Sequence, residues 1–282
     1  MPPRHCRRSE RRPLTLPFLP AFVAAGAAAV VLGASGCTPA VPVSPDPAPG
    51  GQASAPSPAK LLESLAARDT ALGSFQAQGK LHYEGPGGKV RSANMIVVKA
   101  PDKVRIDFRS PFSLTYTVVT DGSELVAYDR GEKIMYVGEP TIDNIGRYTR
   151  VPASVETLAR LVRGMPPLPP GPARGEVLSS GEDWLWRVPL EDGSVLELLF
   201  GADGLHPKRA TLGREQTPDF TAFFEGYRDV AGVAVPHEIR ADLPDGGRVQ
   251  LTYSVVWRDR MHDDNAFRLE PPAGVRVVEM DE

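Results

Sequence analysis

Most of this chain alternates apolar and polar residues with a period of two, the pattern of strands that bury one face. The alternation is clear over residues 75–109, where Val104, Ile106 and Phe108 fall on one face, and it continues over 114–138. A second block repeats it over 183–259. Turn signals such as Gly-Pro-Gly-Gly separate the runs at intervals of about 8–12 residues, which predicts a meander of about ten or eleven antiparallel strands.

Two segments change to the helical period. Residues 58–72 follow Ser57 and residues 155–162 follow Ser154, and each segment has an apolar stripe with a glycine shortly after its end. A sheet of this length must curl, and two amphipathic helices can cover its concave side. The sequence therefore predicts a mainly β (α+β) fold, an incomplete antiparallel β-barrel with helices over the open side and a hydrophobic cavity beneath them.

The apolar positions of the strands are the candidates for lining that cavity. Alternation groups them on one face of each strand, but it does not say which face lines the cavity and which is the outer surface. The candidate residues are Ile96, Val98, Val104, Ile106, Phe108, Trp184, Trp186, Leu198, Phe200, Phe223 and Tyr253.

The N-terminus has the layout of a secretory signal peptide, with arginines first, an apolar stretch over residues 14–32 and small residues before Cys37. A cysteine at the cleavage point makes it similar to a bacterial lipoprotein signal. This predicts a signal peptide over residues 1–36, a lipidated Cys37 with a Pro/Ala-rich linker over 37–57, and one domain over 58–282. An ordinary signal peptide with an incidental cysteine, or an uncleaved anchor, is the alternative. By the enterobacterial sorting rule, the absence of Asp after the cysteine favours the periplasmic face of the outer membrane.

Composition and motifs give no sign of catalysis. The 282 residues carry a net charge of −3, which gives no reason to expect nucleic-acid binding. The histidines have no metal-ligand spacing, and no nucleophile elbow or phosphate loop is present. The run from His262 to Asn265 could coordinate a cation, but we expect it to be a solvated polar turn just before the last strand. Asp107 is expected to be a surface charge paired with Arg105 or Arg109. We therefore expect a monomeric, non-enzymatic protein with no cofactor and no metal.

Four stretches resemble the LolA/LolB-like superfamily of bacterial lipoprotein carriers and receptors. They are FQAQGKLHY (75–83), DKVRIDFRSPFS (102–113), VPASVETLARLVRGMPPLP (151–169) and AFRLEPPAGVRVVEMD (266–281). The lipid anchor at Cys37 makes the chain similar to the lipidated receptor, although its extra length over residues 200–260 and its carrier-like C-terminal motif mark it as divergent.

The resemblance implies a cavity that accepts the acyl chains of lipoproteins, delivered by a periplasmic carrier and inserted into the outer membrane. It also implies roles for three residues. Arg105 matches the arginine that holds the helical lid shut, Phe112 matches the apolar tip of a membrane-insertion loop, and Leu114 shares that loop. The divergence leaves another lipid, such as a glycolipid, open as the ligand. A scaffold lipoprotein of the cell envelope, with a filled core and no ligand, is the alternative function.

Overall fold

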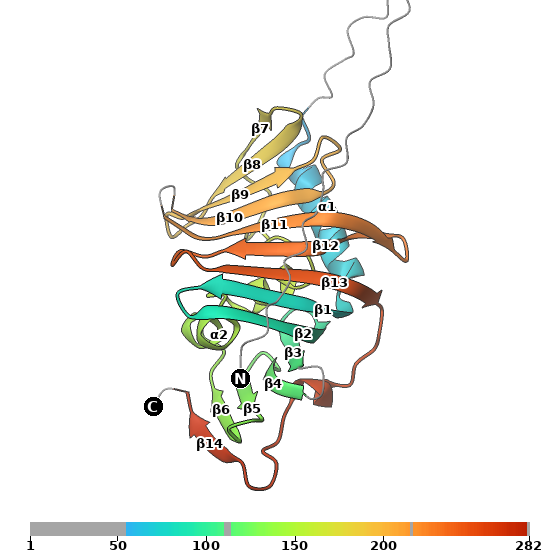
Figure 1. Cartoon of the computed structure of the whole chain (residues 1–282). Helices are drawn as coiled ribbons and strands as arrows, with labels where there is room; N and C mark the ends of the chain where they lie inside the picture. The colour runs from blue at the N-terminus through green and yellow to red at the C-terminus, as the bar shows by residue number, and fades with distance from the viewer. Residues whose placement is uncertain (1–54, 110–113, 215–216, 281–282) are drawn as a thin grey trace, which may run out of the picture. The chain divides into compact units, whose positions relative to one another are not determined.

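The computed structural model describes residues 55–109, 114–214 and 217–280. They belong to one compact unit, Ala53–Glu282, which is built on a single sheet of fourteen strands (Figure 1). In the first half of the chain, the elements are α1 (Pro58–Ala71), β1 (Ser74–Gly85), β2 (Gly88–Lys99), β3 (Lys103–Arg109), β4 (Leu114–Thr120), β5 (Leu125–Asp129), β6 (Ile134–Gly138), α2 (Ile142–Thr149) and α3 (Val155–Leu161). In the second half, they are β7 (Glu176–Ser180), β8 (Asp183–Pro189), β9 (Val195–Phe200), β10 (Pro207–Arg214), β11 (Thr217–Val230), β12 (Val233–Asp242), β13 (Arg248–Arg258), the 3₁₀ turn η1 (Asp264–Phe267) and β14 (Arg276–Glu279).

Two meanders meet in the middle of the sheet. The strand order is β14-β6-β5-β4-β3-β2-β1-β13-β12-β11-β10-β9-β8-β7, so the first strand of the chain pairs with β13. The order begins at β14 and ends at β7, so the sheet is an open, incomplete barrel, as the sequence predicts. Every pairing is antiparallel except that of β14 with β6, which is parallel.

The predicted number of strands, ten or eleven, was too low. The additional strands are short, and β7 and β14 are largely exposed. A strand with little buried surface has no reason to alternate, so its sequence carries only a weak period-two signal. The predicted hairpin at Gly-Pro-Gly-Gly is present, with Gly85 opposite Gly88 at the β1–β2 turn.

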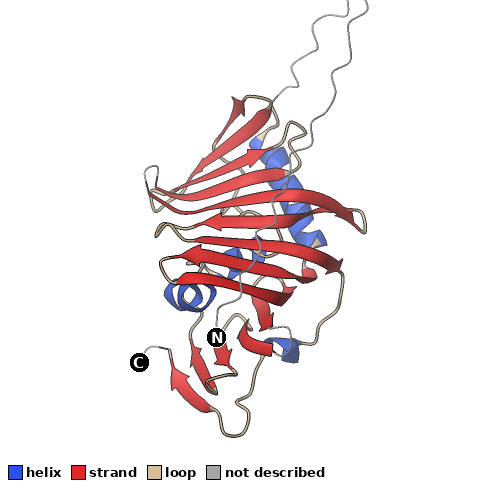
Figure 2. Ribbon diagram, viewed as in Figure 1, coloured by secondary structure: helices blue, strands red, loops and turns tan. Residues whose placement is uncertain are grey.

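The three α-helices in the described part of the chain pack on one face of the sheet, and Figure 2 shows that α1 crosses behind the strands. Each helix begins at a hydroxyl side chain that accepts a backbone N–H, from Ser57 in α1, Thr141 in α2 and Ser154 in α3. Leu65 of α1 and Leu158 of α3 are buried in the main core. None of the described helices is long and apolar enough to cross a membrane.

The sequence did not predict α2. It has only two turns, and one of its two isoleucines, Ile142, is exposed, whereas Ile145 is buried. A stripe with a single fully buried apolar residue is too short for its period to be detected.

A second, smaller core lies on the opposite face, which we call the outer face. There the segment 259–280 crosses β2–β6 before it ends in β14, and Phe267 of η1 packs against Val97, Val119 and Val126. The outer face of this half of the sheet is therefore covered by the C-terminal segment, while the helices cover the inner face.

Candidate functional site

Eight of the eleven residues predicted to line a cavity lie in the packed core of the inner face. None of them is more than 4% exposed, and they share the main core with Leu61, Leu65 and Leu158 of the helices. In this structure the middle of the inner face is therefore filled by its own side chains. The eight are Ile96, Val98, Val104, Ile106, Trp186, Leu198, Phe200 and Tyr253.

The other three predicted residues lie elsewhere. Phe108 and Trp184 are half-buried at the margins of the main core. Phe223 points to the outer face, where the guanidinium of Arg240 lies 3.9 Å from its ring centroid, so the prediction was wrong for this residue. Two phenylalanines are adjacent in β11, and only one of them can face inward. Because Ala222 and Phe224 are buried in the core, Phe223 has the opposite orientation.

An open pocket of about 770 Å³ begins where the filled core ends. It lies beside α2, at the end of the inner face where β3 ends and β4 begins. The volume is within the usual range of small-molecule sites. Phe108 and Tyr116 form an aromatic pair in its wall, with ring centroids 5.8 Å apart, and Tyr148 of α2 faces them. The apolar and aromatic side chains in the lining are Leu81, Tyr83, Val90, Phe108, Tyr116, Tyr148 and Val249.

The tyrosine hydroxyl groups in the pocket wall are neutral. Burial raises the pKa of the Tyr116 hydroxyl far above its ordinary value, and burial also raises the pKa of Tyr148. Both groups therefore stay protonated at neutral pH, so each presents an apolar ring with a single hydroxyl donor to whatever occupies the pocket.

Arginines surround this aromatic wall. Five of them line the pocket, all with exposed side chains, whereas Asp129 is the one acidic residue among the lining residues that the structure describes. Several of the guanidinium groups contact rings or a carbonyl: Arg150 lies over Tyr83, and Arg147 donates to the carbonyl oxygen of Met280 at 2.8 Å. The five are Arg91, Arg109, Arg130, Arg147 and Arg150.

Two residues on the inner face of β2 have buried polar atoms without a partner among the described residues. The hydroxyl oxygen of Ser92, which lines the pocket, has no hydrogen-bond partner in the described part of the chain. The same holds for both amide atoms of Asn94, which is two residues further along the same face and only 3% exposed. Unpaired buried polar atoms are costly, and they commonly mark a place that a ligand or water satisfies.

Arg105 does not hold a helical lid. It lies on the outer face, where its Nε donates to both carboxylate oxygens of Asp107 at 3.1 Å and its Nη1 donates to the carbonyl oxygen of Ala266 at 3.2 Å. Its interaction is therefore with the C-terminal segment. Asp107 is 3% exposed rather than a surface charge, because that segment covers it, and it also accepts a hydrogen bond from Thr117.

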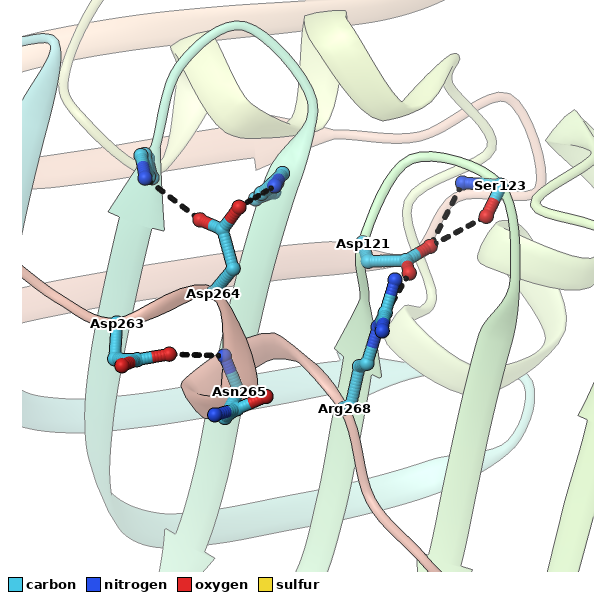
Figure 3. Close-up of polar contacts among 8 residues, drawn as sticks. Asp121, Ser123, Asp263, Asp264, Asn265 and Arg268 are labelled. Carbon is cyan, nitrogen blue, oxygen red and sulfur yellow. Dashed lines mark hydrogen bonds and ion pairs between the residues drawn. The ribbon is translucent and has the colours of Figure 1, made fainter.

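The run from His262 to Asn265 is part of the same C-terminal segment and holds it to the sheet. Asp264 accepts bonds from Lys99 at 2.6 Å and Lys103 at 2.8 Å, which lie at the two sides of the β2–β3 turn (Figure 3). Asp263 caps η1 through the backbone N–H of Asn265. Among the described residues, no group of three or more potential ligands could hold a metal ion.

The same segment has a second charged contact. Arg268 donates to Asp121 at 3.1 Å, and Asp121 also accepts bonds from Ser123 (Figure 3). The Ser123 hydroxyl and the other donors hold the pKa of Asp121 well below its usual range. The carboxylates of Asp121 and Asp264 are therefore charged at neutral pH, and both hold the C-terminal segment against the sheet.

The hydrogen bonds to a covering helix that were expected of Arg105 are made by Arg163, a residue that was not predicted from the sequence. It is fully buried at the end of α3, and it donates to the backbone carbonyls of Ala159, Asp69 and Leu72 and to the carboxylate of Asp69. The last three acceptors lie at the end of α1, so one side chain joins two helices. The signal was an arginine inside the apolar run Leu-Val-Arg-Gly-Met.

The chain leaves α3 in a way that fixes this arrangement. The Tyr253 hydroxyl of β13 donates to the carbonyl oxygen of Val162 at 2.5 Å. Gly164 has a φ of +70° and approaches Pro236 so closely that an added Cβ would lie 2.2 Å from its Cγ. The end of α3 is thus held to both α1 and the sheet. We call the contacts of Arg163 and Tyr253 the helix latch.

Three predicted residues cannot be placed. Cys37 and Phe112 lie outside the described residues. Leu114 opens β4, but its side chain is also outside them.

Comparison with known proteins rests on structure alone. No family model matches the sequence, and no curated protein matches it. A LolA superfamily protein from Nitrosomonas europaea is similar in structure, with a TM-score of 0.54 over 76% of this chain and 99% of that one, at 13% identity. The fold of this chain is therefore similar to that of this LolA superfamily protein.

Two further solved structures have a similar fold. A DUF1329 family protein from Desulfovibrio piger matches with a TM-score of 0.53 at 15% identity, over 76% of this chain and 98% of its own. A putative outer membrane lipoprotein-sorting protein domain from Vibrio parahaemolyticus matches with a TM-score of 0.53 at 13% identity, over 73% and 94%. Identities this low establish the fold and nothing more specific.

Proposed function

We propose that this protein binds the acyl chains of lipoproteins or of other lipids and takes part in their delivery to the outer membrane. The observation that carries the proposal is the open aromatic pocket at the end of the inner face. Phe108, Tyr116 and Tyr148 present ring surface there that the core leaves partly uncovered. Each methylene buried against such a surface contributes about 0.8 kcal/mol, so even part of an acyl chain gains several kcal/mol.

Because the interior is packed, binding of an acyl chain would occur in two stages. The pocket takes the first part of an acyl chain without any change in the helices. Deeper insertion requires α1 and α3 to separate from the sheet, which breaks the helix latch at Arg163 and Tyr253. An interior that opens only when the helix latch breaks suits a protein that binds lipid transiently, during transfer.

The remaining parts of the proposal concern the membrane. Lipidation at Cys37 would anchor the protein at the periplasmic face of the outer membrane, and the linker would let the folded unit reach a periplasmic carrier. Phe112 and Leu114 would insert into the bilayer. Arg109 and Thr115, which come just before and just after residues 110–114 in the sequence, both line the pocket.

The test uses the unit Ala53–Glu282, which has its own core and no anchor. Mass spectrometry of an organic extract of the purified protein is expected to find lipid, and a fluorescent fatty acid is expected to bind with saturation. Phe108→Glu should weaken that binding at least tenfold, because it puts a charge in the aromatic wall.

Phe223→Glu is the matched control. It makes the same exchange at a half-buried phenylalanine on the outer face, so fatty-acid affinity should stay within about twofold of the parent protein. A clean extract together with no fatty-acid uptake would contradict the proposal and favour a scaffold protein. Equal losses in the two variants would show that binding does not occur in the pocket.

A further inference from the structure

We propose that the outer face of the central strands is a membrane-contact site, which lies against a bilayer surface that contains anionic phospholipid. Three exposed cationic side chains carry it: Lys80 of β1, Arg91 of β2 and Arg109 of β3. We call these three residues the basic face. The proposal goes beyond the binding of acyl chains, because the aromatic pocket opens on the other side of the sheet.

The register of the strands directs the three side chains outward. On β2, Ile96 is in the inner core, so Ala93 and Arg91 have the opposite orientation. Ala93 pairs with Lys80 on one side and with Arg109 on the other, and side chains directly opposite in a sheet share a face. Arg91 and Arg109 border the aromatic pocket, but their side chains therefore point away from it. In Figure 1 this outer face is turned toward the viewer, since α1 lies behind the strands.

The acids on the same three strands are already paired with other cations. Glu84, further along β1, forms an ion pair with Lys89. Asp107, two residues before the end of β3, forms an ion pair with Arg105 beneath the C-terminal segment. None of the three cations of the basic face forms an ion pair with another described residue. The charges of the basic face are therefore not neutralised by these acids.

The next strands in the sheet do not neutralise them either. Glu238 of β12 lies opposite Thr252 of β13, which in turn lies opposite Lys80, so two strand spacings separate the two charges. Glu238 shares its own depression of the surface with Arg240 and Arg248. The acids of that half of the outer face thus have cations of their own.

A fourth cation extends the positive surface. Arg228 of β11 lines a depression together with Lys80 and Arg109, and the described lining of this depression contains no Asp or Glu. Neighbouring strands are about 4.8 Å apart, so the backbones of Lys80 and Arg109 lie about 10 Å from each other. That spacing is close to one Debye length at moderate salt, so the cations act on an anionic surface together.

The side chains between the cations favour a bilayer surface over a protein as the occupant. Ala93 separates Lys80 from Arg109, and none of the exposed large hydrophobic residues in the described chain lines the depression beside them. A protein interface takes most of its affinity from a few apolar or aromatic anchors, and the basic face has none. Attraction to a layer of anionic headgroups needs only exposed cations, with no special geometry at any one of them.

The expected strength suits a tethered protein. Each Lys or Arg near an anionic bilayer strengthens binding about fivefold, so three of them give about a hundredfold. The proposed lipid anchor at Cys37 would keep the folded unit close to the bilayer, where a contact of this strength is enough to orient it. The choice of a membrane as the occupant rests on that part of the proposed function.

The experiment uses the unit Ala53–Glu282, which lacks the anchor, so that any binding to vesicles comes from the folded unit. Co-sedimentation compares vesicles of phosphatidylcholine with vesicles in which about 30% of the lipid is phosphatidylglycerol of the same acyl chains. The anionic vesicles should bind at least about tenfold more tightly at low salt. This preference should disappear as salt rises from about 0.05 to 0.5 M, because salt screens exposed charges.

The variant that tests the basic face is Lys80→Gln with Arg91→Gln and Arg109→Gln. It should reduce the preference for anionic vesicles to less than about threefold. Because all three side chains are exposed and form no ion pair with a described residue, the circular dichroism spectrum and the unfolding curve should stay close to those of the parent protein.

The matched control is Lys60→Gln with Arg214→Gln and Arg276→Gln. It removes the same one lysine and two arginines at exposed positions on α1, β10 and β14. The net charge of the two variants is therefore equal, and the control should keep the preference of the parent protein within about twofold.

Three results would overturn the proposal. The first is equal binding of the parent protein to the two kinds of vesicle. The second is an equal loss of preference in the control variant, which would trace the effect to overall charge. The third concerns a short polyglutamate peptide, the probe for an acidic protein: if it binds more tightly than anionic vesicles at an equal concentration of negative charge, the occupant is a protein.

Uptake of a fluorescent fatty acid separates this inference from the proposed function. If the fatty acid binds and anionic vesicles gain no preference, the basic face is rejected while acyl-chain binding stands. If anionic vesicles are preferred and the fatty acid does not bind, the basic face stands while the proposed acyl-chain binding is rejected.

Discussion

The guanidinium of Arg163 donates from Nη2 to the Oδ1 of Asp69 at 2.7 Å, although the two residues are 94 positions apart in the chain. The contact joins the end of α3 to the end of α1 above the filled core. Burial lowers the pKa of Arg163, while Asp69 opposes that shift, so the arginine remains charged. A buried charge with four acceptors is a strong constraint on where the two helices can lie.

Replacing Arg163 with Met should therefore loosen the inner face. Because Asp69 loses its closer partner and keeps only Arg160 at 3.5 Å, and because three carbonyls lose a donor, we expect the free energy of unfolding to fall by about 2–4 kcal/mol. Urea unfolding followed by tryptophan fluorescence measures this. A double cycle with Asp69→Asn should give a coupling of at least about 1 kcal/mol, and strict additivity would mean that the pair does not act as a unit.

Tyr253→Phe removes a single oxygen from the same latch. The Val162 carbonyl is left without its donor in a fully buried position, so stability should fall by about 1–3 kcal/mol. If deep acyl binding requires the latch to open, the variant should also take up a long-chain fluorescent fatty acid faster than the parent protein does. An unchanged uptake rate in stopped-flow measurements, with stability lowered as expected, would separate the latch from lipid entry.

Arg105→Met should affect the outer face alone. It leaves Asp107 buried without its cationic partner and removes the bond to Ala266, so about 3–5 kcal/mol of stability should be lost. Limited proteolysis should then cut within residues 259–280 sooner than in the parent protein. Fatty-acid affinity should remain unchanged in the folded protein. A selective loss of lipid binding would return Arg105 to the role that the family resemblance implies.

Asp264 predicts a dependence of stability on pH. Its bonds to Lys103 and Lys99 lower its pKa from 3.8 to about 2, so the folded state binds a proton less readily than the unfolded state. The group therefore contributes stability that is fully present above pH 4 and is lost as the pH falls from about 4 to 2. Unfolding curves of the parent protein and of Asp264→Asn should differ above pH 4 and converge by pH 2. A constant difference would contradict the assignment.

Phe112→Glu tests the membrane-facing part of the proposal. The variant should bind lipid as the parent protein does but release it to liposomes more slowly, because a charged tip does not enter the bilayer. Transfer of a fluorescent lipid to vesicles measures release, and equilibrium titration measures binding. Equal loss of both would refute the assigned role.

The sequence predicts the strands well because one buried face imposes alternation. It also places the starts of α1 and α3, where Ser57 and Ser154 leave clear capping signals. The sequence does not predict which side chains of β11 face inward. Phe223 and Phe224 are equally apolar, and only the neighbours of β11 in the sheet determine which of them faces inward.

The site was harder to predict because its residues meet only through tertiary structure. Arg91, Arg130 and Arg150 are far apart in the chain and read individually as ordinary surface residues, yet they share one opening. In the same way, nothing around Arg105 in the sequence reveals that a segment more than 150 residues later covers it. The alternation of a strand shows that it has two faces, but not what covers each of them.

The pairing of Phe75 with Arg258 has a consequence for how the polypeptide acquires this shape. The earliest strand has one neighbour available at once and the other only after nearly the whole chain has been made. Contacts of such long range slow the search for the final state. A newly synthesised copy should therefore stay unfolded for longer than a helical protein of its size, which would suit a polypeptide that has to be threaded through a narrow export channel before it folds.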